Sequence, residues 1–283
     1  MIITYKGDKR KPMLLKKKFK SILIATFLSS FFIILFFICY QFSMNQWEKE
    51  SLKKNLRHLS YQELFELWQA GKEVLCLKQQ LTEAWSSVVK EIDAGKMESK
   101  EKVHYPREPI IDKKTYSQYY FHNHREKESG HFHLFLRKGG IESEVIPIFY
   151  DQKNHVVNGP GTFAHLIAIS VDKKGMPKNL FTTNQWVTGE DWYSARDLCK
   201  MVKNFDINED SSLLHRWVSS MFKLFSPQIV ELIMKKEEIL QKKEDSTPLV
   251  EILEDNAVEV ISETKISIEM QMTVLEELLS LHR

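Results

Sequence analysis

The residues of this chain best suited to chemistry are histidines. Four of the ten histidines lie in one stretch, YYFHNHREKESGHFHLFLR, as two His-x-His pairs, His122 with His124 and His131 with His133. Imidazole binds metals and carries protons near neutral pH, but it is also an ordinary hydrogen-bonding side chain. The repeated spacing therefore indicates a site only if the fold brings the two pairs together.

A β-hairpin would bring the pairs together. Residues two apart in a strand point to the same face of a sheet. With the turn centred between Lys127 and Glu128, His122 is expected to oppose His133, and His124 to oppose His131. Five apolar side chains then fall together on the other face of this hairpin, as a half-buried antiparallel pair requires: Tyr119, Phe121, Phe132, Leu134 and Leu136. The sequence predicts a four-histidine face backed by an apolar face.

Such a face has the ligands for a divalent transition metal, Zn or Fe, since imidazole suits both ions. Three protein ligands with an open position would indicate catalysis, whereas four would indicate a structural site. Glu128, in the expected turn, and Glu190, after the last expected strand, are the candidate carboxylates for proton transfer. The alternative is a packed, neutral network of hydrogen-bonded histidines.

Other polar residues are weaker candidates. His165 opens the apolar run HLIAISVD and is either a catalytic neighbour of the cluster or a satisfied core histidine. In the run LFTTNQWVTGEDW, three residues could line a ligand pocket with an aromatic wall, or could simply form a strand and turn: Thr183, Asn184 and Trp186. Arg125 and Arg137 flank the hairpin and could hold an anionic ligand, although arginines at strand ends are usually solvated.

The hydrophobic periodicity predicts helices before and after a sheet in the sequence. A capping box at Ser60 and Glu63 predicts a helix from Tyr61, pausing at Gly71 and ending before Gly95. Polar residues with two prolines predict a loop over 96–114. Strands are expected over 117–125, 131–138, 144–150, 163–172 and 179–186, paired mostly antiparallel because their connections are short. Further helices are expected over 194–203, 211–225 and 226–243, with Ser226 and Pro227 as the N-terminal signal of the last.

The first part of the chain has the features of a membrane anchor. Residues 21–47 carry no charge, and this apolar segment is long enough to cross a bilayer. The basic segment 1–20 before it predicts a cytoplasmic N-terminus. We therefore expect a single-pass membrane protein. If Met44 is the true start of translation, the protein is instead soluble and cytoplasmic.

The charge of the chain is divided between its ends. Segment 1–20 has eight Lys/Arg against one Asp, and residues 226–283 have six Lys/Arg against thirteen Asp/Glu. A balanced centre argues against a nucleic-acid-binding core. Residues 244–283 are expected to form an acidic, flexible tail that could dock a protein partner. The three cysteines lack metal-site or disulfide spacing, leaving Cys76 with Cys199 as the only pair to consider.

Several strings, in order, resemble a bacterial family of unknown function: YSQYYFHNHR, GHFHLFLR, HLIAIS and LFTTNQWVTGE. The resemblance covers about residues 75–243 and implies that the histidine pairs, His165 and the Thr188–Glu190 turn belong to one domain. It implies no activity. Ser129 stands where relatives often have another histidine, and the membrane segment lies outside the shared region.

Together these patterns predict an α+β protein in six parts: a cytoplasmic segment (1–20), an anchor (21–47), helices and a loop (48–115), an antiparallel sheet with the histidine cluster (116–190), C-terminal helices (191–243) and the tail (244–283). The leading hypothesis is a membrane-anchored, metal-dependent enzyme of unspecified reaction. The alternative is a membrane-tethered module that binds or senses a small ligand without catalysis.

Overall fold

The computed structural model describes residues 43–94, 104–122, 130–150, 162–172, 175–208 and 212–282. The chain divides into two compact units, Met1–Lys54 and Asn55–Arg283. In the first unit, the described residues 43–54 are helical. The second unit holds all the strands of the described residues and the candidate site.

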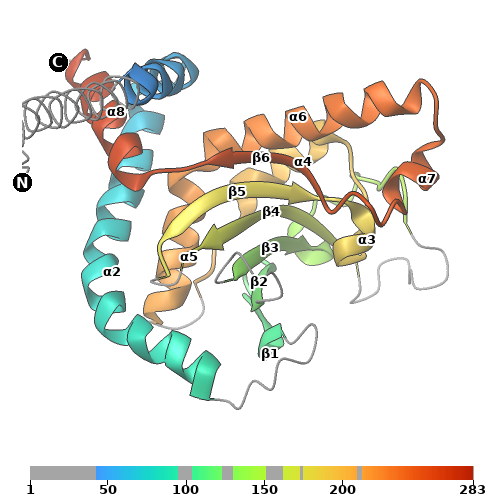
Figure 1. Ribbon diagram of the computed structural model, residues 1–283, viewed down its shortest axis with the longest axis horizontal. Coiled ribbons are helices and arrows are strands. Elements are labelled where there is room, and N and C mark those ends of the chain that lie inside the picture. The colour runs from blue at the N-terminus through green and yellow to red at the C-terminus, as the bar shows by residue number, and fades with distance from the viewer. Residues whose placement is uncertain are drawn as a thin grey trace, which may run out of the picture. The chain divides into compact units, whose positions relative to one another are not determined.

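A six-stranded antiparallel sheet forms the centre of the second unit (Figure 1). Its spatial order follows the chain, with each strand beside the next: β1 (His104–Ile111), β2 (Ser117–His122), β3 (His131–Arg137), β4 (Phe163–Val171), β5 (Pro177–Thr183) and β6 (Val260–Lys265). Among the described residues between the first five strands, the one helical element is the 3-10 turn η1 (Lys138–Gly140). Helices occupy the long connection from β5 to β6.

Helices cover one face of this sheet (Figure 1). They are α4 (Ala195–Met201), α5 (Leu213–Leu224) and α6 (Ser226–Glu244). The short α3 (Gln185–Thr188) precedes α4, η2 (Val202–Asn204) follows α4, and α7 (Leu249–Leu253) follows α6. The ring of Trp217 in α5 lies 5.6 Å from that of Phe132, and the ring of His215 lies 5.8 Å from that of Tyr119. The apolar face expected for the hairpin is thus the helix-covered face, and burial of these side chains stabilises the core.

The long helix α2 (Tyr61–Ala94) begins at the predicted capping box. Ser60 N–H donates to Glu63 Oε2 at 2.8 Å, and Glu63 N–H donates to Ser60 Oγ at 3.3 Å. The expected pause at Gly71 is wrong, since the helix runs through it. The glycine leaves room for packing instead: a Cβ there would lie 2.1 Å from Met272 Sδ in α8 (Ile268–Ser280), so the Met272 side chain would have to move.

Two strands lie where none was expected. Residues 96–114 were predicted as a loop because of Pro106 and Pro109, yet β1 covers His104–Ile111. The pairing of β1 with β2 is irregular between Tyr105 and Ile110, which is where both prolines lie. Proline lacks an N–H, and an irregular edge strand is the place in a sheet that tolerates this loss.

The acidic tail is the larger correction. Residues 244–283 were expected to be flexible, but they contain α7, β6 and α8. β6 pairs along β5, and α8 buries Met272, Val274 and Leu275. The acidic residues gave the tail a disordered composition, whereas its apolar residues at strand and helix spacing complete the fold.

The remaining predicted elements fared differently. The strands over 131–138 and 163–172 and the helices over 194–203, 211–225 and 226–243 are confirmed within a few residues. The predicted strand over 144–150 is wrong: there Phe149 forms only an isolated bridge to Trp192. Cys76 and Cys199 are free thiols.

No helix among the described residues is long and apolar enough to span a bilayer. The predicted anchor, 21–47, lies outside the described residues except for its last five.

Candidate metal centre

The hairpin of β2 and β3 differs from the predicted one by a shift of two residues. His122 opposes His131, and Tyr120 opposes His133, so the predicted pairing of His122 with His133 is wrong. A shift of two keeps each side chain on its face, because the period of a strand is two residues. His122, His131 and His133 therefore still share one face, opposite the helices, and the apolar residues share the other.

Three imidazoles converge on this face. His122 Nε2 lies 2.7 Å from His131 Nε2 and 3.1 Å from His133 Nε2. One ring nitrogen from each histidine lies within 4.8 Å of those of the other two. His131 and His133 are each 1% exposed and His122 is 8% exposed, so water is almost excluded from the cluster.

Hydrogen bonds among the three rings explain the convergence poorly. A neutral imidazole has one N–H and one lone pair, so His122 Nε2 is either a donor or an acceptor to both neighbours. A metal ion accepts lone pairs from all three nitrogens at once. The cluster therefore has the donor set of a metal site.

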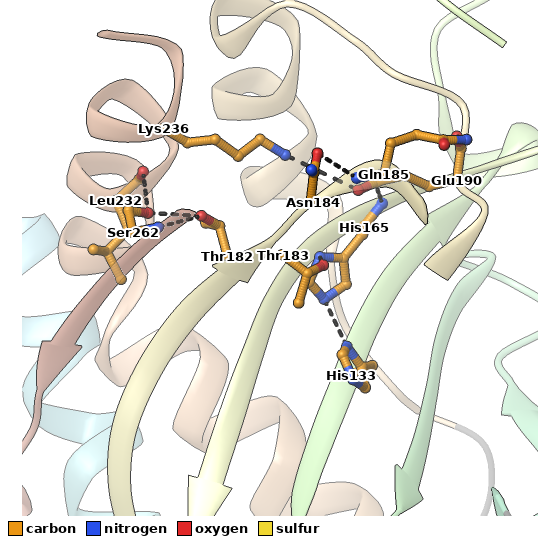
Figure 2. A network of polar contacts seen from close by, with 10 residues as sticks. All are labelled: His133, His165, Thr182, Thr183, Asn184, Gln185, Glu190, Leu232, Lys236 and Ser262. Atoms are coloured by element: carbon orange, nitrogen blue, oxygen red, sulfur yellow. Dashed lines mark hydrogen bonds and ion pairs between the residues drawn. The ribbon is translucent and has the colours of Figure 1, made fainter. Parts of the chain in front are cut away.

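His133 is held from its other side by His165 (Figure 2). His133 Nδ1 lies 3.1 Å from His165 Nε2, and His165 Nδ1 lies 3.2 Å from Thr183 Oγ1. If the lone pair of His133 is at Nε2, its Nδ1–H donates to His165, whose own Nδ1–H donates to Thr183. Metal-binding histidines typically have such an outer partner, which fixes tautomer and ring orientation.

A β-bulge puts His165 in this position. Leu134 opposes Ile167, but the next residue, Phe135, opposes His165, so Leu166 is an extra residue in β4. Regular alternation would have put Leu166 on the histidine face and His165 on the helix face. Because of the bulge, the His165 side chain lies on the histidine face instead and is directed toward His133.

The His165 ring is neutral. Burial lowers its pKa well below the ordinary value, and the charges of Lys236 and His131 lower it further. A neutral imidazole can accept one hydrogen bond and donate another, whereas an imidazolium can only donate hydrogen bonds. The low pKa therefore suits His165 to its place between His133 and Thr183.

The backbone of His165 takes part in a second buried cluster. Its N–H donates to Glu190 Oε2 at 2.5 Å, and Glu190 Oε1 lies 4.0 Å from Lys236 Nζ in α6 (Figure 2). Burial raises the pKa of Glu190 to about 7, against the opposing effects of Lys236 and of the His165 N–H. Glu190, predicted for proton transfer, thus contacts the backbone of His165 rather than an imidazole ring of the triad.

Other residues predicted to bind ligand have contacts within the fold. Arg137 Nη1 donates to Gln118 Oε1 at 2.5 Å. Asn184 caps α3 and donates to Ile252 O, and Trp186 Nε1 donates to Val258 O, so both hold the segment that leads into β6. Of the predicted ligand-binding residues that the structure describes, Thr183 alone contacts the histidine network.

Three predicted site residues, His124, Arg125 and Glu128, lie outside the described residues. Sequence reasoning missed Lys236, which reads as one more charged residue of an amphipathic helix. It also missed the backbone pairing of His104 with His122 across β1 and β2. His104 lies in segment 96–114, which was predicted as a loop because of its polar residues and prolines.

The comparisons with known proteins add the family and nothing on activity. No curated protein and no solved structure matches the chain. A family model described as a domain of unknown function (DUF6969) matches residues 68–266, from within α2 to the end of β6. This range contains the triad, His165, Glu190 and Lys236, and it is most of the second unit. The chain therefore belongs to the DUF6969 family.

Proposed function

We propose that His122, His131 and His133 bind one divalent transition metal ion, Zn²⁺ or Fe²⁺, and that the protein is a metal-dependent enzyme. The observation that carries this proposal is the approach of His122 Nε2 to both His131 Nε2 and His133 Nε2, at 2.7 and 3.1 Å. Tetrahedral ligands about 2.0–2.1 Å from zinc lie roughly 3.3 Å from one another. Small movements of the rings would therefore give a coordination sphere.

The outer partners support the same reading. The chain from His133 through His165 to Thr183 is compatible with the His133 tautomer whose Nε2 lone pair faces His122, which coordination requires. Aromatic rings pack around the triad, with Tyr120 5.2 Å from His133 and Phe181 5.3 Å from His131. A dry site of this kind strengthens the electrostatic effect of a bound ion on a substrate oxygen or a water molecule.

Catalysis requires a coordination position that the protein leaves open. Two further histidines are candidates for closing it. His104 pairs with His122 through the backbone, and His124 follows His122 at strand spacing in the sequence. If neither is a ligand, three protein nitrogens and one exchangeable position remain, and the bound ion can act as a Lewis acid.

Metal analysis of the full chain tests the proposal. The purified protein should hold close to one equivalent of Zn or Fe, or take it up on reconstitution, and the H133A variant should not. Less than about a tenth of an equivalent in the reconstituted wild-type protein would refute metal binding.

Cobalt substitution tests the open position. The visible spectrum of the Co²⁺ protein reports coordination number, and an open site changes its spectrum when a small anion such as azide is added. We expect this change in the wild-type, H104A and H124A proteins alike. An azide-insensitive wild-type spectrum that becomes sensitive in H104A or H124A would identify a fourth protein ligand and a structural site.

A second candidate function rests on the 2.7 Å separation of His122 Nε2 and His131 Nε2, which is also a hydrogen-bond distance. On this reading the histidines form a metal-free network in a ligand-binding or sensing module, tethered to a membrane if residues 21–47 form an anchor. The metal analysis separates the two functions, because the module should remain metal-free after reconstitution.

A further inference from the structure

A pocket of about 150 Å³ lies beside the buried pair of Lys236 and Glu190. Its walls come from α4, α6, the start of α7, Ile148, and the segment of Trp192 and Tyr193. Most of the lining is apolar, with Ile148, Leu198, Ile233, Leu240 and Leu249 among its residues. The wall also contains Trp192, Tyr193 and four polar residues of α6, Lys236, Glu237, Gln241 and Glu244. A pocket of this size and lining suits a small, mostly apolar molecule.

Lys236 is the unusual residue in this wall. Its side chain is 5% exposed, although lysine is among the side chains least often buried. The Nζ atom lies 3.7 Å from the centroid of the Trp192 ring and 4.0 Å from Glu190 Oε1. The first distance fits a cation–π contact, whereas the second is too long for a hydrogen bond. The amine is thus positioned without a close ionic partner among the described residues.

Two other polar atoms nearby have no hydrogen-bond partner among the described residues. They are Glu190 Oε1 and the hydroxyl oxygen of Tyr193, and both are buried. Buried polar atoms normally have partners, so unsatisfied ones next to a pocket indicate a bound molecule. A molecule that used the amine and these oxygens would need one polar group on an otherwise apolar body.

We propose that the pocket binds small aliphatic aldehydes or ketones and that Lys236 captures them as a Schiff base. The amine nitrogen bonds to the carbonyl carbon while the Glu190 carboxyl gives its proton to the carbonyl oxygen and then takes one from the nitrogen. The carbinolamine loses its oxygen as water and forms the C=N bond. The net reaction is amine plus carbonyl to imine plus water, with no oxidant or reductant.

The electrostatics of the pair favour this chemistry. Burial lowers the pKa of Lys236, with Glu190 acting in the opposite direction, and burial raises the pKa of Glu190 to about 7. Both shifts favour the neutral forms, and a neutral amine with a protonated carboxyl is the state that attacks a carbonyl. Each unit of pKa lowering makes the neutral fraction of an amine about tenfold larger at neutral pH.

The test uses the full chain and a small probe, butanal, with borohydride to convert any Schiff base into a stable adduct. Mass spectrometry of a digest gives the labelling rate at each lysine. Lys235, the exposed neighbour of Lys236 on α6, is the internal control. We expect Lys236 to label at least about tenfold faster than Lys235 at pH 7. Equal or slower labelling of Lys236 would overturn the proposal.

Two variants locate the reaction. In E190Q the amide oxygen can still accept the His165 N–H, but the acid is gone, so labelling of Lys236 should slow while that of Lys235 is unchanged. L249W narrows the pocket and should have the same selective effect. Unchanged Lys236 labelling in both variants would contradict the proposed site. H133A should label like the wild-type protein, because this inference does not rest on the proposed metal centre.

Discussion

Two buried polar clusters meet at His165 from opposite directions. The ring of His165 faces the histidine triad, whereas its backbone N–H faces Glu190 and, through it, Lys236. The triad brings together ring nitrogens of three histidines within 4.8 Å of one another. The other cluster already contains one basic and one acidic group.

This difference determines what each cluster can bind. Converging lone pairs repel one another unless a cation or shared protons lie between them, which is why the triad suits a metal ion. A lysine and a glutamate in a dry environment can instead become neutral by transferring a proton, so they suit a neutral, polarisable ligand. Burial alone therefore does not determine which ligand a cluster can bind; the charges of its groups do.

The largest expected effect is loss of metal stabilisation on removing a ligand. At a metal concentration of 100 times Kd, binding stabilises the folded state by about 2.7 kcal/mol. For a domain of this size that corresponds to a rise in Tm of roughly 5–10 °C. We predict this rise for the wild-type protein with Zn²⁺, and its absence in H133A.

Thermal unfolding with and without Zn²⁺ measures this effect. H133A must first show a cooperative transition and a wild-type circular dichroism spectrum without metal. An equal rise in Tm in both proteins would show that the ion binds elsewhere.

The next effect concerns the outer partner of His133. H165A should weaken metal binding about 10–100-fold, the usual range for loss of an outer hydrogen bond, and T183V should weaken it less. T182V is the matched control. Thr182 Oγ1 lies 2.7 Å from Ser262 Oγ and forms its hydrogen bond there, not with the histidine network. Competition with a chromophoric chelator measures the affinities. If T183V and T182V had equal metal affinities and H165A bound metal as tightly as the wild-type protein, His165 would not support the metal site.

The third effect is the pH dependence of stability at Glu190, which faces Lys236, Asp191, Thr188 and the His165 N–H. Its folded pKa of about 7 lies above the unfolded value, so the folded state binds the extra proton. Stability from this group is present at low pH and is lost as pH rises toward 7 and beyond. We predict that the unfolding free energy of the wild-type protein falls by about 2 kcal/mol relative to E190Q between pH 5 and pH 7. Denaturant titrations at both pH values measure this difference; parallel curves for the two proteins would contradict it.

The smallest effect provides the contrast to Glu190. Asp112 is also fully buried, and burial alone would raise its pKa. The backbone N–H groups of Thr115, Asn208 and Lys114 donate to it at 2.7, 2.7 and 2.9 Å and lower the pKa to about 2. Because the folded pKa is depressed, its contribution is present at neutral pH and lost as pH falls.

We predict a loss of about 1 kcal/mol from Asp112 between pH 5 and pH 3. Comparing the wild-type protein with D112N over this range measures it. A variant that loses stability as steeply as the wild-type protein would assign the acid sensitivity to other groups.

Much of the site could be predicted from the sequence, because in a regular strand alternate residues lie on the same face of the sheet. The shift of two residues in the hairpin changed the partner of each residue and left His122, His131 and His133 together. The position of His165 could not be predicted in this way, since it depends on one extra residue in β4. A bulge has no signature in the alternation of an apolar run such as HLIAIS.

The sheet was predicted in part for a related reason. Its central strands are apolar runs, and these were found. Its two edges, β1 and β6, were missed because prolines and acidic residues resemble loops and tails in the sequence. Edge strands commonly carry such residues, which hinder pairing with other chains.

The late position of β6 in the chain has a consequence for synthesis. β5 is complete at Thr183, but its partner begins at Val260, after all of α3 to α7. On the ribosome, the open edge of β5 is therefore exposed until β6 emerges, and an unpaired edge is a template for aggregation. A chain shortened before Val260 should aggregate during expression even though every residue of both buried clusters is present.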